Sequence, residues 1–189
     1  MEKINKILNN NGVISFVTDT VWGIGCLPTS MEAVDKIYEI KGRERSKPLI
    51  LMSNSLDNLL PYVENMSISQ QEIAKKYFPG AITLVMNKTE KTPMYLTAGM
   101  TTVGIRVPNN SVFAKICEEI DGHVLATTSA NLSNLPAAKN YKEAIEFIGD
   151  YVDYVVPNEE DGAKGIESTV VLLLEDNVKI LRQGAIVLD

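Results

Sequence analysis

Four cations gather in one short stretch of an acidic chain. The segment KGRERSKPLI, residues 41–50, contains Lys41, Arg43, Arg45 and Lys47, while the whole chain carries a formal net charge of −6. Arginine offers phosphate a planar pair of donors and lysine offers a point charge, so this cluster favours a local polyphosphate site. The alternative from these residues alone is a helix end followed by a solvated face.

The spacing of Lys41 and Arg43 favours the functional interpretation. Two residues apart in an extended segment, they project to the same side. They precede the apolar segment PLILMS (48–53), so the cations would lie at a strand edge, where α/β proteins bind ligands. In such a polar stretch, we expect truncation of Lys41 to cost little stability. If the preceding helix instead continues toward residue 42, Lys41 lies at its C-terminus, where the helix dipole favours a cation.

Three loops are rich in small hydroxyl residues: TDT (18–20), TTSAN (127–131) and GIEST (165–169). In the second, Ser129 and Asn131 can direct donors to one acceptor group. Taken singly, each loop is typical of turns, because these residue types bond to their own backbone. Arg106 stands inside the apolar segment VGIRVP (103–108), where it either reaches solvent from a sheet edge or pairs with an anion.

Several functional classes are excluded by what the sequence lacks. It contains no phosphate-binding loop, no complete dinucleotide fingerprint and no nucleophile elbow. One histidine and two cysteines cannot fill a four-ligand zinc site without carboxylates. We expect a cytoplasmic protein in a reducing environment, because the sequence has no apolar run of membrane-spanning length and no secretory signal. The acidic balance argues against a broad nucleic-acid-binding surface.

Hydrophobic periodicity predicts alternating strands and helices. The expected strands are 13–17, 48–53, 81–87, 103–108, 123–128, 151–157 and a final pair formed by STVVLLLE and VKILRQG. The expected helices are 3–10, 30–40, 55–61, 69–78, 111–120 and 141–149, and residues 18–28 are expected to be a loop. This order predicts an α/β protein whose final hairpin makes the sheet mixed, and the length fits one domain, residues 1–189.

The combination of segments is more specific than any one of them. KGR followed much later by SAN resembles the paired K-x-R…S-x-N signature of the YrdC-like family. Matching segments run from Gly12 to about Ile186: TDTVWGIG, KPLILM, PGAITLV, TTVGIRVP, GIESTVV and LRQGAI. The chain therefore resembles threonylcarbamoyl-AMP synthases, in their short, single-domain TsaC-type form. The resemblance implies a twisted mixed parallel and antiparallel sheet with flanking helices and a concave ligand cavity.

The resemblance also implies a reaction and its partners. L-Threonine, bicarbonate and ATP would give threonylcarbamoyl-AMP and pyrophosphate, with Mg²⁺ accompanying ATP and no metal ligands assigned to the protein. The product would pass to a complex that transfers the threonylcarbamoyl group to tRNA, with only weak contact between tRNA and this chain. Asp19 is the nearest candidate carboxylate for the ion.

Site residues follow from the matched motifs. The polar signature around ATP, with catalytic roles, corresponds to Lys41, Arg43, Ser129 and Asn131. Further nucleotide contacts correspond to Lys47, Thr102 and Arg182. The threonine site corresponds to Thr20, Met52, Arg106, Thr127 and Ser168, with Arg106 pairing with the amino-acid carboxylate.

Three positions depart from the family pattern. Val17 replaces a usual proline, Trp22 replaces a usual tyrosine, and Met52 replaces a histidine that often lines the threonine pocket. Two alternative functions remain at this point. One is a double-stranded or ribosomal RNA-binding module of the same fold, and the other is a carbamoyl-AMP-forming domain of the kind that serves hydrogenase maturation.

Overall fold

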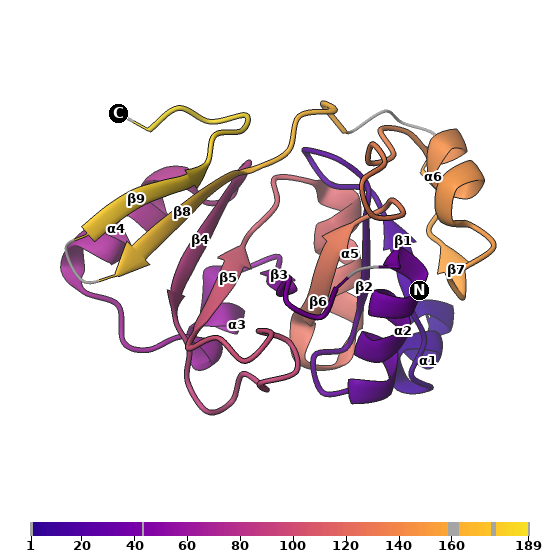
Figure 1. Cartoon of the computed structure of the whole chain (residues 1–189), viewed down its shortest axis with the longest axis horizontal. Coiled ribbons are helices and arrows are strands. Elements are labelled where there is room, and N and C mark those ends of the chain that lie inside the picture. Colours follow the sequence, from indigo (N-terminus) through magenta and orange to yellow (C-terminus); the bar gives the residue numbers. More distant parts are fainter. Residues whose placement is uncertain (1, 43, 159–162, 175–176, 189) are drawn as a thin grey trace.

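A mixed sheet runs the length of the protein (Figure 1). The computed structural model describes residues 2–42, 44–158, 163–174 and 177–188. Within these ranges nine strands form one sheet in the order β7-β1-β2-β6-β3-β5-β4-β8-β9. Their bounds are β1 Ile14–Phe16, β2 Gly23–Cys26, β3 Ile50–Ser53, β4 Ile82–Asn87, β5 Thr102–Arg106, β6 Val124–Ser129, β7 Tyr154–Val155, β8 Thr169–Leu174 and β9 Asn177–Arg182.

The predicted α/β class with a mixed sheet is confirmed, and the mixing goes beyond the final hairpin. Strands β1 and β7, β3 and β5, and β4 and β8 pair in parallel. The other neighbouring pairs are antiparallel, including β2 with both β1 and β6. Figure 1 shows the β8–β9 hairpin at one end of the sheet and β1, β7 and α6 at the other.

One strand contradicts the predicted loop at residues 18–28. Gly23–Cys26 forms β2, which the sequence alone did not indicate because glycines occupy two of its four positions. Both glycines lie in tight packing: a Cβ on Gly23 or Gly25 would lie 3.0 Å from the ring of Phe16, and one on Gly25 would also lie 3.0 Å from the carbonyl of Ala126. A side chain at either position would require its neighbours to shift.

The helices agree closely with the predicted positions. They are α1 Glu2–Asn9, α2 Met31–Lys41, α3 Leu56–Leu59, α4 Ile68–Tyr77, α5 Ser111–Glu119 and α6 Tyr141–Ile148, with short 3₁₀ turns η1 at Leu60–Tyr62 and η2 at Asp121–His123. Ser30 caps α2 by accepting the Ala33 amide, and Gly42 ends it with φ 54°. Among the described segments, no helix is long and apolar enough to cross a membrane.

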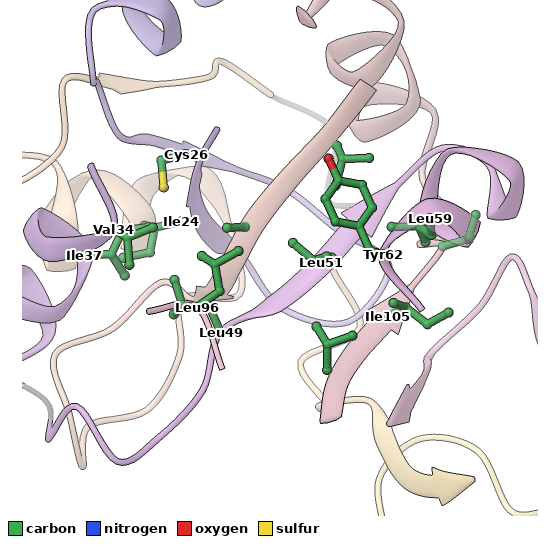
Figure 2. Packing of buried hydrophobic residues seen from close by; sticks show 14 of the residues in the cluster. Ile24, Cys26, Val34, Ile37, Leu49, Leu51, Leu59, Tyr62, Leu96 and Ile105 are labelled. Atoms are coloured by element: carbon green, nitrogen blue, oxygen red, sulfur yellow. The ribbon is translucent and has the colours of Figure 1, made fainter. Parts of the chain in front are cut away.

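The two faces of the sheet carry different side chains. On one face, Ile24, Leu51, Ile105 and Ala126 belong to a large apolar cluster, which α2, α3, α4 and α6 cover. Figure 2 shows part of this cluster, with Val34 and Ile37 of α2 beside Ile24 and Cys26, and Leu59 and Tyr62 near Ile105. On the other face, α1 and α5 cover a second cluster that includes Phe16, Met52 and Leu125.

Strand register places a continuous set of positions on the second face. Gly25 pairs with Thr127, Thr127 with Ile50, and Ile50 with Gly104. Two residues further along β3 and β5, and so on the same face, Met52 pairs with Arg106. We call this the cavity face, because small and polar side chains interrupt its apolar cover near the middle of the sheet.

The two cysteine thiols should be unreactive in the folded protein. Both are buried and unpaired, and burial raises the pKa of Cys26 and of Cys117 to about 12. At pH 8 the reactive thiolate is therefore scarce, so we expect negligible modification by a colorimetric disulfide reagent over an hour. Both thiols should react within minutes in guanidinium. Fast labelling of the native protein would contradict this packing.

Candidate functional site

A cavity of about 320 Å³ opens on the cavity face. Strand positions form its floor, and the loops after β1, α2 and β6, the segment before β8 and the end of β9 form its walls. The lining residues are Thr18, Thr20, Val21, Trp22, Gly23, Lys41, Lys47, Pro48, Ile50, Met52, Thr83, Arg106, Thr127, Thr128, Ser129, Asn131, Ser133, Asn134, Glu167, Ser168, Val170 and Arg182. Segments far apart in the sequence therefore build one polar hollow.

Arg106 is the buried cation of the floor. Its side chain is only 3% exposed, and its guanidinium forms an ion pair with Asp19. It also donates to Thr20 Oγ1 at 2.8 Å and to the carbonyl of Gly80 at 3.2 Å. An arginine has five N–H donors in a planar fork, so these contacts orient the group and leave donors for a ligand.

Asp19 supports Arg106 from outside the cavity. It does not line the hollow, although its neighbours Thr18 and Thr20 do. Burial lowers the pKa of Arg106, while the Asp19 carboxylate acts in the opposite direction and Arg182 lowers that pKa further. An arginine stays protonated in proteins despite such effects. Because two guanidinium groups disfavour each other across this site, an anion bound near both is favoured.

One wall of the cavity is built around Ser168. Arg182, at the end of β9, donates to the Ser168 carbonyl at 2.9 Å and forms a 2.6 Å ion pair with Glu167. The hydroxyls of Ser168 and Thr83 lie 2.9 Å apart. Gly184 passes so close that a Cβ there would lie 2.3 Å from the Glu167 carbonyl, which brings the end of β9 against this segment.

The structure corrects the expected conformation of the basic stretch. Lys41 is the last residue of α2 and Gly42 is left-handed, so the alternative of a helix that continues toward residue 42 is confirmed and an extended conformation at Lys41 is wrong. Lys41 is 4% exposed, and its ammonium bonds to Ser129 and Asn131. Its truncation should therefore cost stability, contrary to the expectation drawn from a polar stretch.

The other cations of the stretch differ from one another. Lys47 is exposed and lines the cavity. Arg45 is not among the lining residues and pairs with Asp35 at 2.6 Å on the surface, an interaction that raises the pKa of Arg45. Arg43 lies outside the described residues. A clamp formed by all four cations is therefore not the observed arrangement.

The remaining predicted residues fall into two groups. The proposed amino-acid residues Thr20, Met52, Thr127 and Ser168 all line the same cavity as Arg106. Thr102 does not line it. Thr102 begins β5 opposite Asn87, at the end of the strand remote from Arg106.

The structure adds residues that the sequence reasoning did not select. Thr83 and Glu167 line the cavity and contact Ser168 and Arg182, respectively. Both lie in segments that matched the family, PGAITLV and GIESTVV, so a signal was present. Side chains alternate between the two faces along β4. Because Ile82 and Leu84 belong to the apolar core, Thr83 between them points to the opposite face, where it lines the cavity.

No cluster of three or more His, Cys, Asp and Glu side chains suited to a metal ion occurs within the described ranges. Asp19, the candidate carboxylate, is instead paired with Arg106. Glu167 is the carboxylate that lines the cavity, and Arg182 occupies one of its oxygens. These residues do not form a dedicated cation site of several carboxylates.

The family of this chain is shown by its similarity to known proteins. The Sua5/YciO/YrdC family model, described as telomere recombination, matches residues 6–184. The chain belongs to this family. The chain is similar to the threonylcarbamoyl-AMP synthase of Idiomarina loihiensis, with 34% identity over 154 residues that cover 80% of this chain and 82% of the relative. That of Klebsiella pneumoniae is 35% identical over 161 residues, covering 84% of this chain and 82% of the relative.

The fold of the family is found in a solved structure. The Sua5 protein of P. abyssi, crystallised with L-threonine, superposes with a TM-score of 0.89 at 30% identity. The match covers 97% of this chain and 54% of that one, so this chain spans about half the length of that relative. The predicted family and its twisted mixed sheet with flanking helices are thus confirmed.

The buried Arg106–Asp19 pair should behave as a coupled unit. Either Arg106→Met or Asp19→Leu leaves one buried charge without its partner, and each should lower the free energy of unfolding by about 3–5 kcal/mol. The double variant should lose at least about 2 kcal/mol less than the sum of the two, because no uncompensated charge remains. Urea unfolding of the four proteins measures this.

The exposed Arg45–Asp35 pair provides a matched control. Arg45→Met should leave the urea midpoint within experimental error, because solvent screens this pair. Strict additivity of the Arg106 and Asp19 substitutions would show that the two groups do not stabilise each other.

Proposed function

We propose that this chain is a threonylcarbamoyl-AMP synthase, which converts L-threonine, bicarbonate and ATP to threonylcarbamoyl-AMP and pyrophosphate. The observation that supports this best is a single cavity whose lining contains a buried arginine, Arg106, held by Asp19 and Thr20, together with several hydroxyl groups and further cations. An amino acid and a nucleotide both carry anionic groups that such a lining would bind. Membership of a family that contains threonylcarbamoyl-AMP synthases supports the same reaction.

The threonine end would lie over the floor of the cavity. Arg106 would pair with the amino-acid carboxylate, because its guanidinium is already oriented by Asp19 and Thr20. Thr127 and Ser168 offer hydroxyls nearby in the lining, and Met52 offers an apolar wall for the methyl group. A thioether is flexible and fills irregular gaps, so Met52 suits a small branched side chain.

The nucleotide end would lie toward the loops. Lys47 and Arg182 line the cavity there, with Ser129 and Asn131 on the loop after β6. We also assign Arg43 to the phosphates from its motif alone. Mg²⁺ would arrive with ATP and be held mainly by phosphate oxygens, since the described part of the chain offers no carboxylate cluster for it.

The chemistry needs positioning more than a strong base. The neutral threonine amine attacks the carbon of carbon dioxide, a C=O π bond opens, and the nitrogen loses a proton to give a carbamate; with bicarbonate as the source, the C–OH bond breaks and water leaves. A carbamate oxygen then attacks the α-phosphorus, and the bond to the leaving pyrophosphate breaks. The cavity would hold the two reactants together and stabilise developing negative charge with its fixed cations.

The product is an activated carbamoyl adenylate, which must be consumed by a transfer reaction. We assign that step to a separate complex acting on tRNA in the cytoplasm. The hollow, polar site supports an enzyme over the RNA-binding alternative, and the net charge of −6 disfavours a broad surface for phosphodiester backbones.

Pyrophosphate release should require every substrate. Incubation with ATP, bicarbonate and L-threonine should give pyrophosphate and a product with the mass of threonylcarbamoyl-AMP. Omission of threonine or bicarbonate should lower release to background, because the carbamate is the nucleophile. Equal release without threonine, or none with all substrates, would overturn the proposed function.

Amino-acid choice tests the threonine site separately. Serine lacks one methyl, which an apolar pocket typically rewards by about 1–3 kcal/mol, so we expect roughly 10- to 200-fold weaker binding. Valine keeps the shape but lacks the hydroxyl, and a site that bonds this hydroxyl should reject it strongly. Isothermal titration with the three amino acids measures both effects. Valine binding as tight as threonine binding would refute a hydroxyl partner.

A further inference from the structure

The ammonium of Lys41 is surrounded by acceptors on one loop. It lies 2.7 Å from the carbonyl of Ser129, 2.9 Å from the carbonyl of Asn131 and 2.8 Å from Asn131 Oδ1. The Ser129 hydroxyl is more distant, at 3.4 Å. A lysine has three N–H donors, and three acceptors within 2.9 Å use all of them.

The side chains that contact Lys41 make further hydrogen bonds within the same loop. Asn131 Oδ1 accepts from the Ser129 hydroxyl at 2.6 Å as well as from Lys41. The Asn131 amide nitrogen donates to the carbonyls of Leu132 and Leu135, at 3.0 and 2.6 Å. These bonds use both donors and both acceptor positions of the Asn131 side chain. The side-chain donors of Lys41, Ser129 and Asn131 are therefore all engaged within the protein.

A backbone bond adds a second attachment. The amide of Ser133 donates to the carbonyl of Lys41 at 2.8 Å, so residue 41 holds the loop with its main chain and its side chain. We call residues 129–135 the wall loop, because Ser129, Asn131, Ser133 and Asn134 all line the cavity. The wall loop is thus tied to the last residue of α2.

A lysine suits this position for physical reasons. Its ammonium is compact and supplies three donors that can rotate, whereas an arginine fork is planar and larger. The C-terminal end of a helix carries partial negative charge, which lowers the free-energy cost of burying the Lys41 ammonium there. The buried charge still attracts an anion at a distance, but its hydrogen bonds are directed into the protein.

We propose that Lys41 is a positioning residue that locks the wall loop, and that it does not donate a hydrogen bond to the nucleotide phosphates. The effect on ATP binding rests on the proposed function, whereas the lock does not. Phosphate contacts are then made by Lys47 and Arg182, the exposed cations of the lining, together with Arg43 as assigned from its motif. Loss of Lys41 should therefore act on the nucleotide through Asn131 and its neighbours.

Hydrogen–deuterium exchange of the ligand-free protein tests the lock directly. In Lys41→Met, amides of residues 129–138 should exchange roughly tenfold faster or more, because charge-assisted bonds to this loop are lost. The control is Lys47→Met, which removes a cavity cation that is exposed. It should leave exchange of these amides unchanged. Unchanged exchange in Lys41→Met would overturn the proposal.

A second variant covers the case in which Lys41→Met does not fold. Asn131→Ala removes one acceptor of Lys41 and both amide donors to the loop, so the same amides should again exchange faster. Protection equal to that of the unmodified protein in Asn131→Ala would also overturn the lock.

ATP titration distinguishes positioning from direct contact. If Lys41 acts through Asn131, the Lys41→Met and Asn131→Ala effects on the Kd for ATP should be clearly less than multiplicative in the double variant. Multiplicative effects would indicate a direct bond from Lys41 to the nucleotide and would overturn the proposal. If the unmodified protein binds no ATP, the proposed function fails, and the exchange experiment still decides the lock.

Discussion

The strict alternation of side chains along each strand is the constraint on which the rest of this protein depends. On one face of the sheet it aligns large aliphatic residues of β2, β3, β5 and β6 into a continuous core under four helices. The same alternation turns Gly25, Thr127, Ile50 and Gly104 to the opposite face. A shift of one residue in register would exchange the two sets and bury polar groups in the core.

Glycines on the cavity face let neighbouring side chains pack close to the backbone of the sheet. Gly23 and Gly25 let β2 pass under the ring of Phe16, and the loop before β2 then brings Thr18 and Thr20 toward Arg106. Gly104 likewise leaves space beside Ile50, since a Cβ there would lie 2.8 Å from that side chain. Packing and site formation are therefore consequences of the same small residues.

Two buried cations organise the polar surroundings in the ligand-free protein. Arg106 is held by Asp19 and Thr20, and Lys41 is held by Ser129 and Asn131. Each cation is satisfied by groups from a distant part of the sequence, so it joins loops that the sheet alone would leave independent. Such preorganisation reduces the ordering that a ligand must impose when it binds.

The sequence was sufficient for the elements whose signal is local. Ser30 marks the start of α2 through its own hydrogen-bonding preference, and apolar periodicity located α5 and α6. The strand β2 could not be predicted in this way. Its glycines pack closely against the ring of Phe16 on β1 and against residues of β6, and a single-sequence pattern contains no information about those contacts.

For the site, the sequence by itself determined which residue types are present and which motifs contain them, including Arg106 in an apolar strand and the cluster that begins at Lys41. Only the tertiary structure decided which group each of these charged residues contacts. It placed Asp19 behind Arg106, directed Lys41 into the wall loop, left Arg45 on the surface with Asp35, and placed Thr102 beyond the cavity lining. The physical reason is that hydrogen bonds and ion pairs act over a few ångströms, and long-range strand pairing sets which groups come that close.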